Sequence, residues 1–144
     1  MGRINVGRVV LGGLLAAVVL NVVDWLLYGV LLKPELAAAL QALGRQAIDI
    51  QVPMFVLSDF VYSIGRGIGL VCVYAAIRPR LGAGPKTAVI AGLSVWCFVG
   101  LLHALGEAPM RLFPQRLYLI GAIVALIQYP GADVVGASAY KEVS

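Results

Sequence analysis

Long apolar stretches separated by short polar segments dominate the pattern of the chain. A helix needs about 20 mostly apolar residues to cross the hydrocarbon core of a bilayer. Four stretches reach or approach that length, at about residues 9–32, 53–77, 87–105 and 112–139. Pro130 lies inside the last stretch, where neighbouring helices can satisfy the carbonyl that it frees, so one kinked helix is expected there. The pattern predicts an all-α fold, a four-helix transmembrane bundle, as a single integral membrane domain over residues 1–144.

The segment between the first two stretches has a helical pattern of its own. It begins with Pro34 and Glu35, which suit the first turn of a helix. Apolar residues then recur at helical spacing, at Leu36, Leu40, Leu43 and Ala47. We expect a short amphipathic helix along the outer membrane interface, which either covers the bundle ends or forms a lid over a cavity.

The composition agrees with a membrane environment. Hydrophobic residues make up 61% of the chain and charged residues 12%, and the mean hydropathy is +0.95. A water-soluble fold of this size could not bury so much apolar surface, so the lipid bilayer is the expected partner of its exterior. The net charge is +4, but no run of Lys or Arg is present, which argues against nucleic-acid binding.

The basic residues predict an orientation in the membrane. Six of them fall on one side of a four-span arrangement, namely Arg3, Arg8, Arg78, Arg80, Lys86 and Lys141. Four fall on the other side, namely Lys33, Arg45, Arg111 and Arg116. The positive-inside rule then places both termini of this multi-pass protein in the cytoplasm.

Four ionisable residues interrupt the apolar stretches, and they are Asp24, Asp59, Arg66 and Asp133. Charge in the bilayer core is costly and normally faces the interior of a bundle. One face of the first helix carries Asn21, Asp24 and Tyr28, and one face of the second carries Asp59, Tyr62, Ser63 and Arg66. We expect the two faces to form one polar cluster, with hydrogen bonds from Asn21, Tyr28 and Tyr62.

Depth along the helices orders these polar residues. At about 1.5 Å per residue, Asp24 and Asp59 are expected at similar depth in the outer half of the bilayer. Arg66 and Gln128 are expected near the middle. The secondary candidates His103 and Asp133 are expected near the outer end of the third helix and in the inner half, respectively.

Two functions are compatible with such a cluster. An Asp–Arg pair can lock helix packing, or help the protein to support a complex as a homo-oligomer or beside a membrane-protein partner. The alternative follows from the charge count, because three carboxylates and one arginine leave at least one acid without an internal cation. Such an acid is what a small proton- or ion-coupled transporter or channel subunit needs, and it would use Asp24 and Asp59.

Motifs for other chemistry are missing from the sequence. It contains no nucleotide-binding loop, no G-x-S-x-G and no H-E-x-x-H. One histidine and two separated cysteines, Cys72 and Cys97, do not make a metal or haem site within one chain. We therefore expect no metal, no cofactor and no enzymatic activity.

The segment DWLLYGVLLKPELAAAL and the closing ASAYKE resemble small bacterial four-helix membrane proteins. In that group, the first helix ends in a run like that of Tyr28, Gly29, Val30, Leu31, Leu32 and Lys33. The resemblance implies a protein of the bacterial inner (cytoplasmic) membrane, and it implies no activity and no functional residues.

Overall fold

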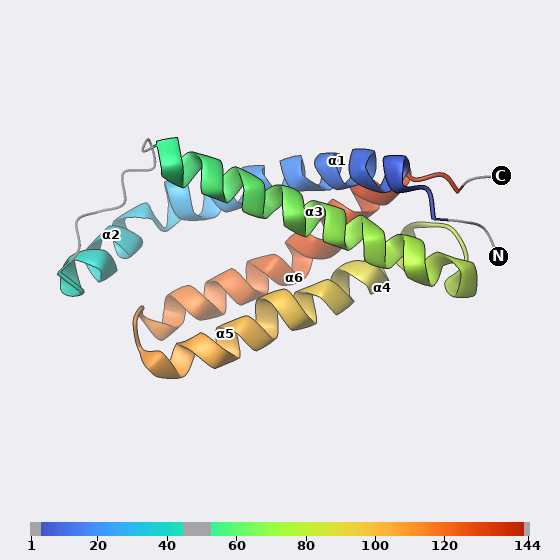
Figure 1. Ribbon diagram of the computed structural model, residues 1–144. Helices are drawn as coiled ribbons and strands as arrows, with labels where there is room; N and C mark the ends of the chain where they lie inside the picture. Colours follow the sequence, from blue (N-terminus) through green and yellow to red (C-terminus); the bar gives the residue numbers. More distant parts are fainter. Residues whose placement is uncertain (1–3, 45–52, 143–144) are drawn as a thin grey trace.

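The computed structural model describes residues 4–44 and 53–142, and the regular structure in these two ranges is entirely helical. Four helical segments are long and apolar enough to cross a membrane, at Val6–Leu31, Val56–Leu81, Pro85–Met110 and Gln115–Ser138. They pack into one bundle (Figure 1). The predicted all-α four-helix bundle is confirmed, and the chain is a multi-pass membrane protein.

The first span is one continuous helix whose backbone changes from α-helical to π-helical. Helix α1, Val6–Asp24, begins after Asn5, whose side chain accepts a hydrogen bond from the Arg8 backbone N–H at 3.2 Å. The backbone continues as a π-helical segment, Trp25–Leu31. This cap places the start of the helix a few residues before the predicted residue 9.

The third span has the same change of backbone. It consists of α4 Pro85–Val95, the π-helical segment Trp96–Leu101, α5 Leu102–Glu107 and a 3₁₀ turn at Ala108–Met110. Each π-helical segment begins with a tryptophan whose ring lies over a glycine four residues later. A Cβ atom on Gly29 would lie 3.2 Å from Trp25 Cδ1, and one on Gly100 would lie 2.9 Å from Trp96 Cδ1.

The short helix expected between the first two spans is α2, Lys33–Ala42. Pro34 and Glu35 stand in its first turn, and Ala39 and Leu40 are buried. Glu35 also forms an ion pair with Arg116 at 3.3 Å, which ties α2 to the start of the fourth span. Ala47 and the rest of residues 45–52 lie outside the described residues.

The second and fourth spans are the long helices α3, Pro53–Leu81, and α6, Gln115–Ser138. Helix α6 continues through Pro130 as one helix, and its backbone is packed closely against α4 there. A Cβ atom on Gly92 would lie 2.5 Å from Pro130 Cα. Between α3 and α4, Gly82 and Gly84 adopt positive φ angles of 87° and 138°, which favour glycine.

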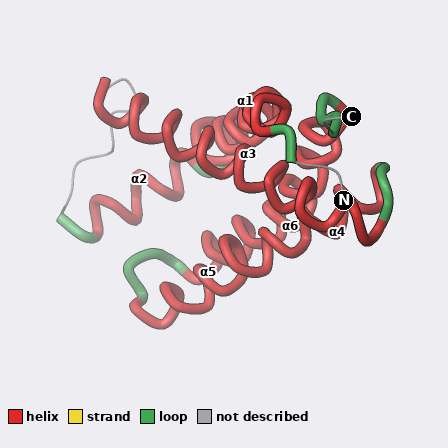
Figure 2. The backbone as a smooth tube through the Cα atoms, turned by 45° about the vertical axis from the view of Figure 1, so that its right-hand side comes forward, coloured by secondary structure: helices red, strands yellow, loops and turns green. Residues whose placement is uncertain are grey.

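Both chain termini and the α3–α4 turn lie at one end of the bundle, called here the termini end (Figure 1). Helix α2 and the α5–α6 connection lie at the other, the α2 end. In the half near the termini, small residues bring the helices close together. Gly12 contacts Gly136, and Gly67 contacts Gly13 and Ala17. Toward the α2 end the helices diverge, and both views show α3 and α5 well apart (Figures 1 and 2).

Candidate functional site

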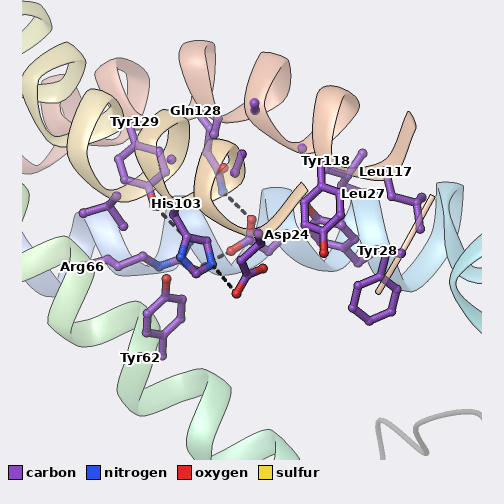
Figure 3. A pocket seen from close by; sticks show the side chains of 18 of the residues that line it. Asp24, Leu27, Tyr28, Tyr62, Arg66, His103, Leu117, Tyr118, Gln128 and Tyr129 are labelled. Carbon is purple, nitrogen blue, oxygen red and sulfur yellow. Dashed lines mark hydrogen bonds and ion pairs between the residues drawn. The ribbon is translucent and has the colours of Figure 1, made fainter. Parts of the chain in front are cut away.

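An ion pair and a neighbouring glutamine join three spans in the bundle interior. Arg66 Nη2 on α3 lies 2.5 Å from Asp24 Oδ2 at the end of α1, and the two side chains are only 10% and 19% exposed. Gln128 Nε2 on α6 donates hydrogen bonds of 2.9 Å both to Asp24 Oδ1 and to the Leu20 carbonyl. One carboxylate therefore holds α1, α3 and α6 together (Figure 3).

The remaining contacts of Arg66 are weaker and come from both flanks. Arg66 Nη2 donates to Ser63 Oγ at 3.1 Å, and Nη1 donates to Tyr129 Oη at 3.5 Å. The guanidinium carbon lies 4.4 Å from the centre of the Tyr62 ring and 6.0 Å from that of Tyr129. The two rings add cation–π attraction to the ion pair with Asp24, so the charge of Arg66 is stabilised by one carboxylate and two aromatic rings.

Asp59 joins this cluster indirectly. Asn21 Nδ2 donates to Asp59 Oδ2 at 3.4 Å and to Ser63 Oγ at 3.2 Å, so Asn21 connects Asp59 to the contacts of Arg66. Within the described ranges, the ion pair of Arg66 is made with Asp24 and not with Asp59. Asp59 stands on the same helix as Arg66, two helical turns earlier, whereas Asp24 stands on α1 and is the acid that Arg66 contacts.

The hydrogen bonds expected from Tyr28 and Tyr62 are not found among the described residues. Tyr62 offers the face of its ring to Arg66, and neither its hydroxyl nor that of Tyr28 makes a hydrogen bond in the part of the chain that the structure describes. The Tyr28 hydroxyl instead lies against α6, where a Cβ atom on Gly121 would be 2.5 Å from it.

A cavity of about 380 Å³ lies beside the ion pair, in the half of the bundle near α2. Its floor includes Asp24, Arg66 and Gln128, and Figure 3 shows these side chains together with Tyr62 and Tyr129. Helix α5 and the π-helical segment before it form one wall, and α6 forms another. Leu36 of α2 also lines the cavity, so this short helix contributes to its edge.

The secondary candidates fall in different places. Gln128 belongs to the cluster itself, and His103 lines the cavity, where its Nε2 lies 3.4 Å from Glu107 Oε1. Asp133 is separate from both. It is fully buried on α6 toward the termini end, and neither carboxyl oxygen has a hydrogen-bond partner among the described residues.

Sequence reasoning did not identify three polar residues of the described lining, namely Tyr129, Glu107 and Tyr118. Spacing offered a signal for two of them. Tyr129 directly follows Gln128, and Glu107 stands one helical turn after His103. The two Trp-x-x-x-Gly patterns likewise marked the π-helical segments, a backbone form that is frequent at functional sites.

The described ranges contain no group of three or more His, Cys, Asp or Glu residues placed to hold a metal ion. The described lining of the cavity combines one guanidinium, carboxylate and hydroxyl groups with apolar side chains. Comparisons with protein-family models, with curated proteins and with solved structures found no match to this chain. The functional conclusion below is therefore drawn from the fold and the site geometry.

Proposed function

We propose that this is a ligand-binding protein of the bacterial cytoplasmic membrane, with its cavity open toward the outer side. The polar cluster has two tasks in this proposal, since it locks α1, α3 and α6 and also forms the floor of the cavity. One observation carries the proposal. The Arg66–Asp24 pair, already compensated within the protein, lies beside a cavity of about 380 Å³ and not in a dry core.

Locking follows from the partners of the ion pair. Arginine stays charged when buried, and its planar guanidinium holds a carboxylate in a fixed geometry. Breaking such a pair leaves an uncompensated charge in a medium that solvates it poorly. The helices therefore keep the register in which the ion pair forms. Gln128 extends this constraint to α6 through two hydrogen bonds of 2.9 Å.

Locking alone does not account for the cavity. Protein interiors are close-packed, and few voids exceed the size of a water molecule. Sites for small molecules occupy about 300–1,000 Å³ and combine apolar walls with a few polar groups. The cavity beside Asp24 falls in this range and has this composition, which supports a binding role in addition to the structural one.

The orientation rests on the basic residues. Arg8 lies in the first turn of α1, Arg78 and Arg80 lie in the last turn of α3, and Lys86 lies in the first turn of α4, so all four belong to the termini end. The positive-inside rule assigns that end to the cytoplasm, and α2 with the cavity mouth then faces outward.

Thiol labelling tests whether water and small solutes reach the cavity. In a Cys72→Ala/Cys97→Ala background, Ala104→Cys and Ala125→Cys each place a thiol on the cavity wall. Val18→Cys and Ile127→Cys are matched controls on the outer surface, where the native residues are 60% and 75% exposed. In lipid nanodiscs, a charged methanethiosulfonate should modify the two cavity thiols and spare the two lipid-facing thiols. Cavity thiols as unreactive as the controls would contradict the proposal.

Transport is the second candidate, and one-sided access favours it. The cavity is confined to the α2 half, whereas glycine contacts such as Gly12–Gly136 close the half near the termini. An alternating-access carrier shows such an arrangement in one of its two states. Asp59, which no arginine pairs in the described ranges, is the carboxylate best placed to exchange a proton or ion.

Reconstitution separates the two candidates. If the protein is a carrier, proteoliposomes should dissipate an imposed pH gradient faster than empty liposomes, and Asp59→Asn should abolish the difference. Equal rates with and without the protein would reject proton exchange through Asp59 and leave ligand binding intact.

A further inference from the structure

The residues that line the cavity carry an excess of negative charge. Among the described residues of the lining, three carboxylates, from Asp24, Asp59 and Glu107, stand against one guanidinium, that of Arg66. The formal charge of this described lining is therefore −2 when His103 is neutral. Such an imbalance in a membrane-embedded, partly enclosed space attracts cations and repels anions.

The excess of negative charge comes from two different helices that line the cavity. Arg66 is paired with Asp24 at 2.5 Å, which leaves Asp59 on α3 and Glu107 on α5 as the uncompensated acids. His103 Nε2 lies 3.4 Å from Glu107 Oε1, and a positive charge on His103 would reduce the excess to −1. Arg116 lies outside the lining and is paired with Glu35.

Aromatic rings add a second preference for positive charge. The rings of Tyr62 and Tyr129 face Arg66, while Tyr28, Phe113 and Tyr118 form a further aromatic part of the lining. Phe113 and Tyr118 meet edge to face, with their centroids 6.3 Å apart. Ring faces attract cations, most strongly where water is displaced, and they also pack well against flat apolar groups.

The size of the cavity and its surroundings narrow the class of cation. A bare metal ion would need several close ligands, and the described residues provide no such group. A volume of about 380 Å³ suits an organic molecule. The helices that line the cavity also expose apolar side chains to lipid, including Phe60, Leu102 and Leu105, so a molecule with an apolar body can reach the protein through the bilayer.

We propose that the cavity binds an amphipathic organic cation, with one delocalised or quaternary positive charge on an apolar, ring-containing body. Its charge lies between Asp59 and Glu107, and its apolar body lies against Tyr28, Phe113 and Tyr118. This inference rests on the proposed ligand-binding function and names the ligand class of that same site.

A pair of ions with the same shape and opposite charge tests the inference. Tetraphenylphosphonium and tetraphenylborate are titrated into the purified full-length protein by isothermal titration calorimetry, with protein-free micelles as the blank. The expected result is saturable binding of one phosphonium ion per chain, at least tenfold tighter than binding of the borate.

Variants locate the binding. Asp59→Asn and Glu107→Gln should each weaken phosphonium binding by about threefold to tenfold, because each removes one of the two uncompensated charges. Glu142→Gln is the matched control, since it removes the same charge at the termini end, where Glu142 lies near Arg78. Its affinity should equal that of the unaltered protein, and all three variants should elute as folded protein.

Each remaining outcome has a definite meaning. Equal or tighter binding of tetraphenylborate overturns the cationic class but leaves the cavity as a binding site. Phosphonium binding that Asp59→Asn and Glu107→Gln do not weaken overturns the assignment to this cavity. If neither ion binds while the thiols at Ala104→Cys and Ala125→Cys are modified, the ligand class is wrong and the accessible cavity stands. If those thiols are also unreactive, the proposed function itself fails.

Discussion

Arg66 on α3 and Asp24 on α1 form an ion pair of 2.5 Å at the residue where the first span changes from α-helical to π-helical backbone. The carboxylate of Asp24 also accepts a hydrogen bond from Gln128 on α6. The place where three helices are tied together is thus also the place where the helix geometry changes and the cavity begins. This coincidence suggests that the cluster fixes the shape of the cavity as well as the packing.

Gln128 should contribute to stability through its two hydrogen bonds. Gln128→Leu removes the donor that serves both Asp24 and the Leu20 carbonyl. Side-chain hydrogen bonds between membrane helices are worth about 0.6–2 kcal/mol, so we expect a loss of about 1–2 kcal/mol in the free energy of unfolding. Gln115→Leu, at the exposed first residue of α6, is the control and should have little effect. Equal stability of the two variants in thermal unfolding would argue against the role of Gln128.

Gly67 should be required for the contact between α3 and α1. A Cβ atom there would lie 2.7 Å from the Ala17 backbone nitrogen and would also clash with the Gly13 carbonyl, so Gly67→Ala should force the helices apart. Overpacking of this kind costs about 1–3 kcal/mol. The matched control is Gly65→Ala on the same helix, where a Cβ atom meets nothing within 4 Å. Thermal unfolding should show a clear loss for Gly67→Ala and none for Gly65→Ala, and the opposite order would refute the α1–α3 packing.

Asp133 should be dispensable for stability, in contrast to Asp24. Its carboxyl group is fully buried, and neither oxygen has a partner among the described residues. Burying a polar group without hydrogen bonds costs free energy, and a charged one costs more. Asp133→Asn keeps the shape of the side chain and removes the charge, so the unfolding midpoint should stay equal or rise. A large loss of stability would reveal a partner of Asp133 and would contradict its isolation.

Periodicity alone carries the prediction of the fold a long way. Apolar stretches of sufficient length predicted four spanning helices, and a Pro–Glu start with helical spacing predicted α2, both of which the structure confirms. The boundaries differ because local caps decide them. Asn5 extends the first span toward the N-terminus, and the left-handed Arg111 with φ 53° separates the third and fourth spans.

The contacts within the site depend on three-dimensional packing that spacing does not specify. Helical spacing puts Asp59 and Arg66 on one face and Asp24 on a facing helix, but it does not say which acid contacts Arg66. In the structure, Arg66 pairs with Asp24. Gly67 faces α1, whereas a Cβ atom on Gly65 or Gly69, which share the more conspicuous G-x-x-x-G spacing, would meet nothing within 4 Å.

The sequence offered a cavity only as one of two interpretations of the short helix between the first two spans. The described lining of the cavity comes from all four spans and from α2, which are far apart along the chain. A cavity is therefore a property of the whole bundle and not of any segment. A pattern read along one helix at a time indicates which residues face inward, but not whether the space between them is filled.

The coupling between Asp24 and Arg66 is the most direct test that this ion pair holds the bundle together. Asp24→Asn, Arg66→Gln and the double variant form a double-mutant cycle, measured by reversible unfolding in mixed micelles. Each single change should lower the free energy of unfolding by about 3–5 kcal/mol, because it leaves a buried charged group without its partner. The double variant should lose less than the sum of the two, with a coupling free energy of about 1–3 kcal/mol. Losses that add to within about 0.5 kcal/mol would show that the two residues act independently and would contradict the central role of the pair.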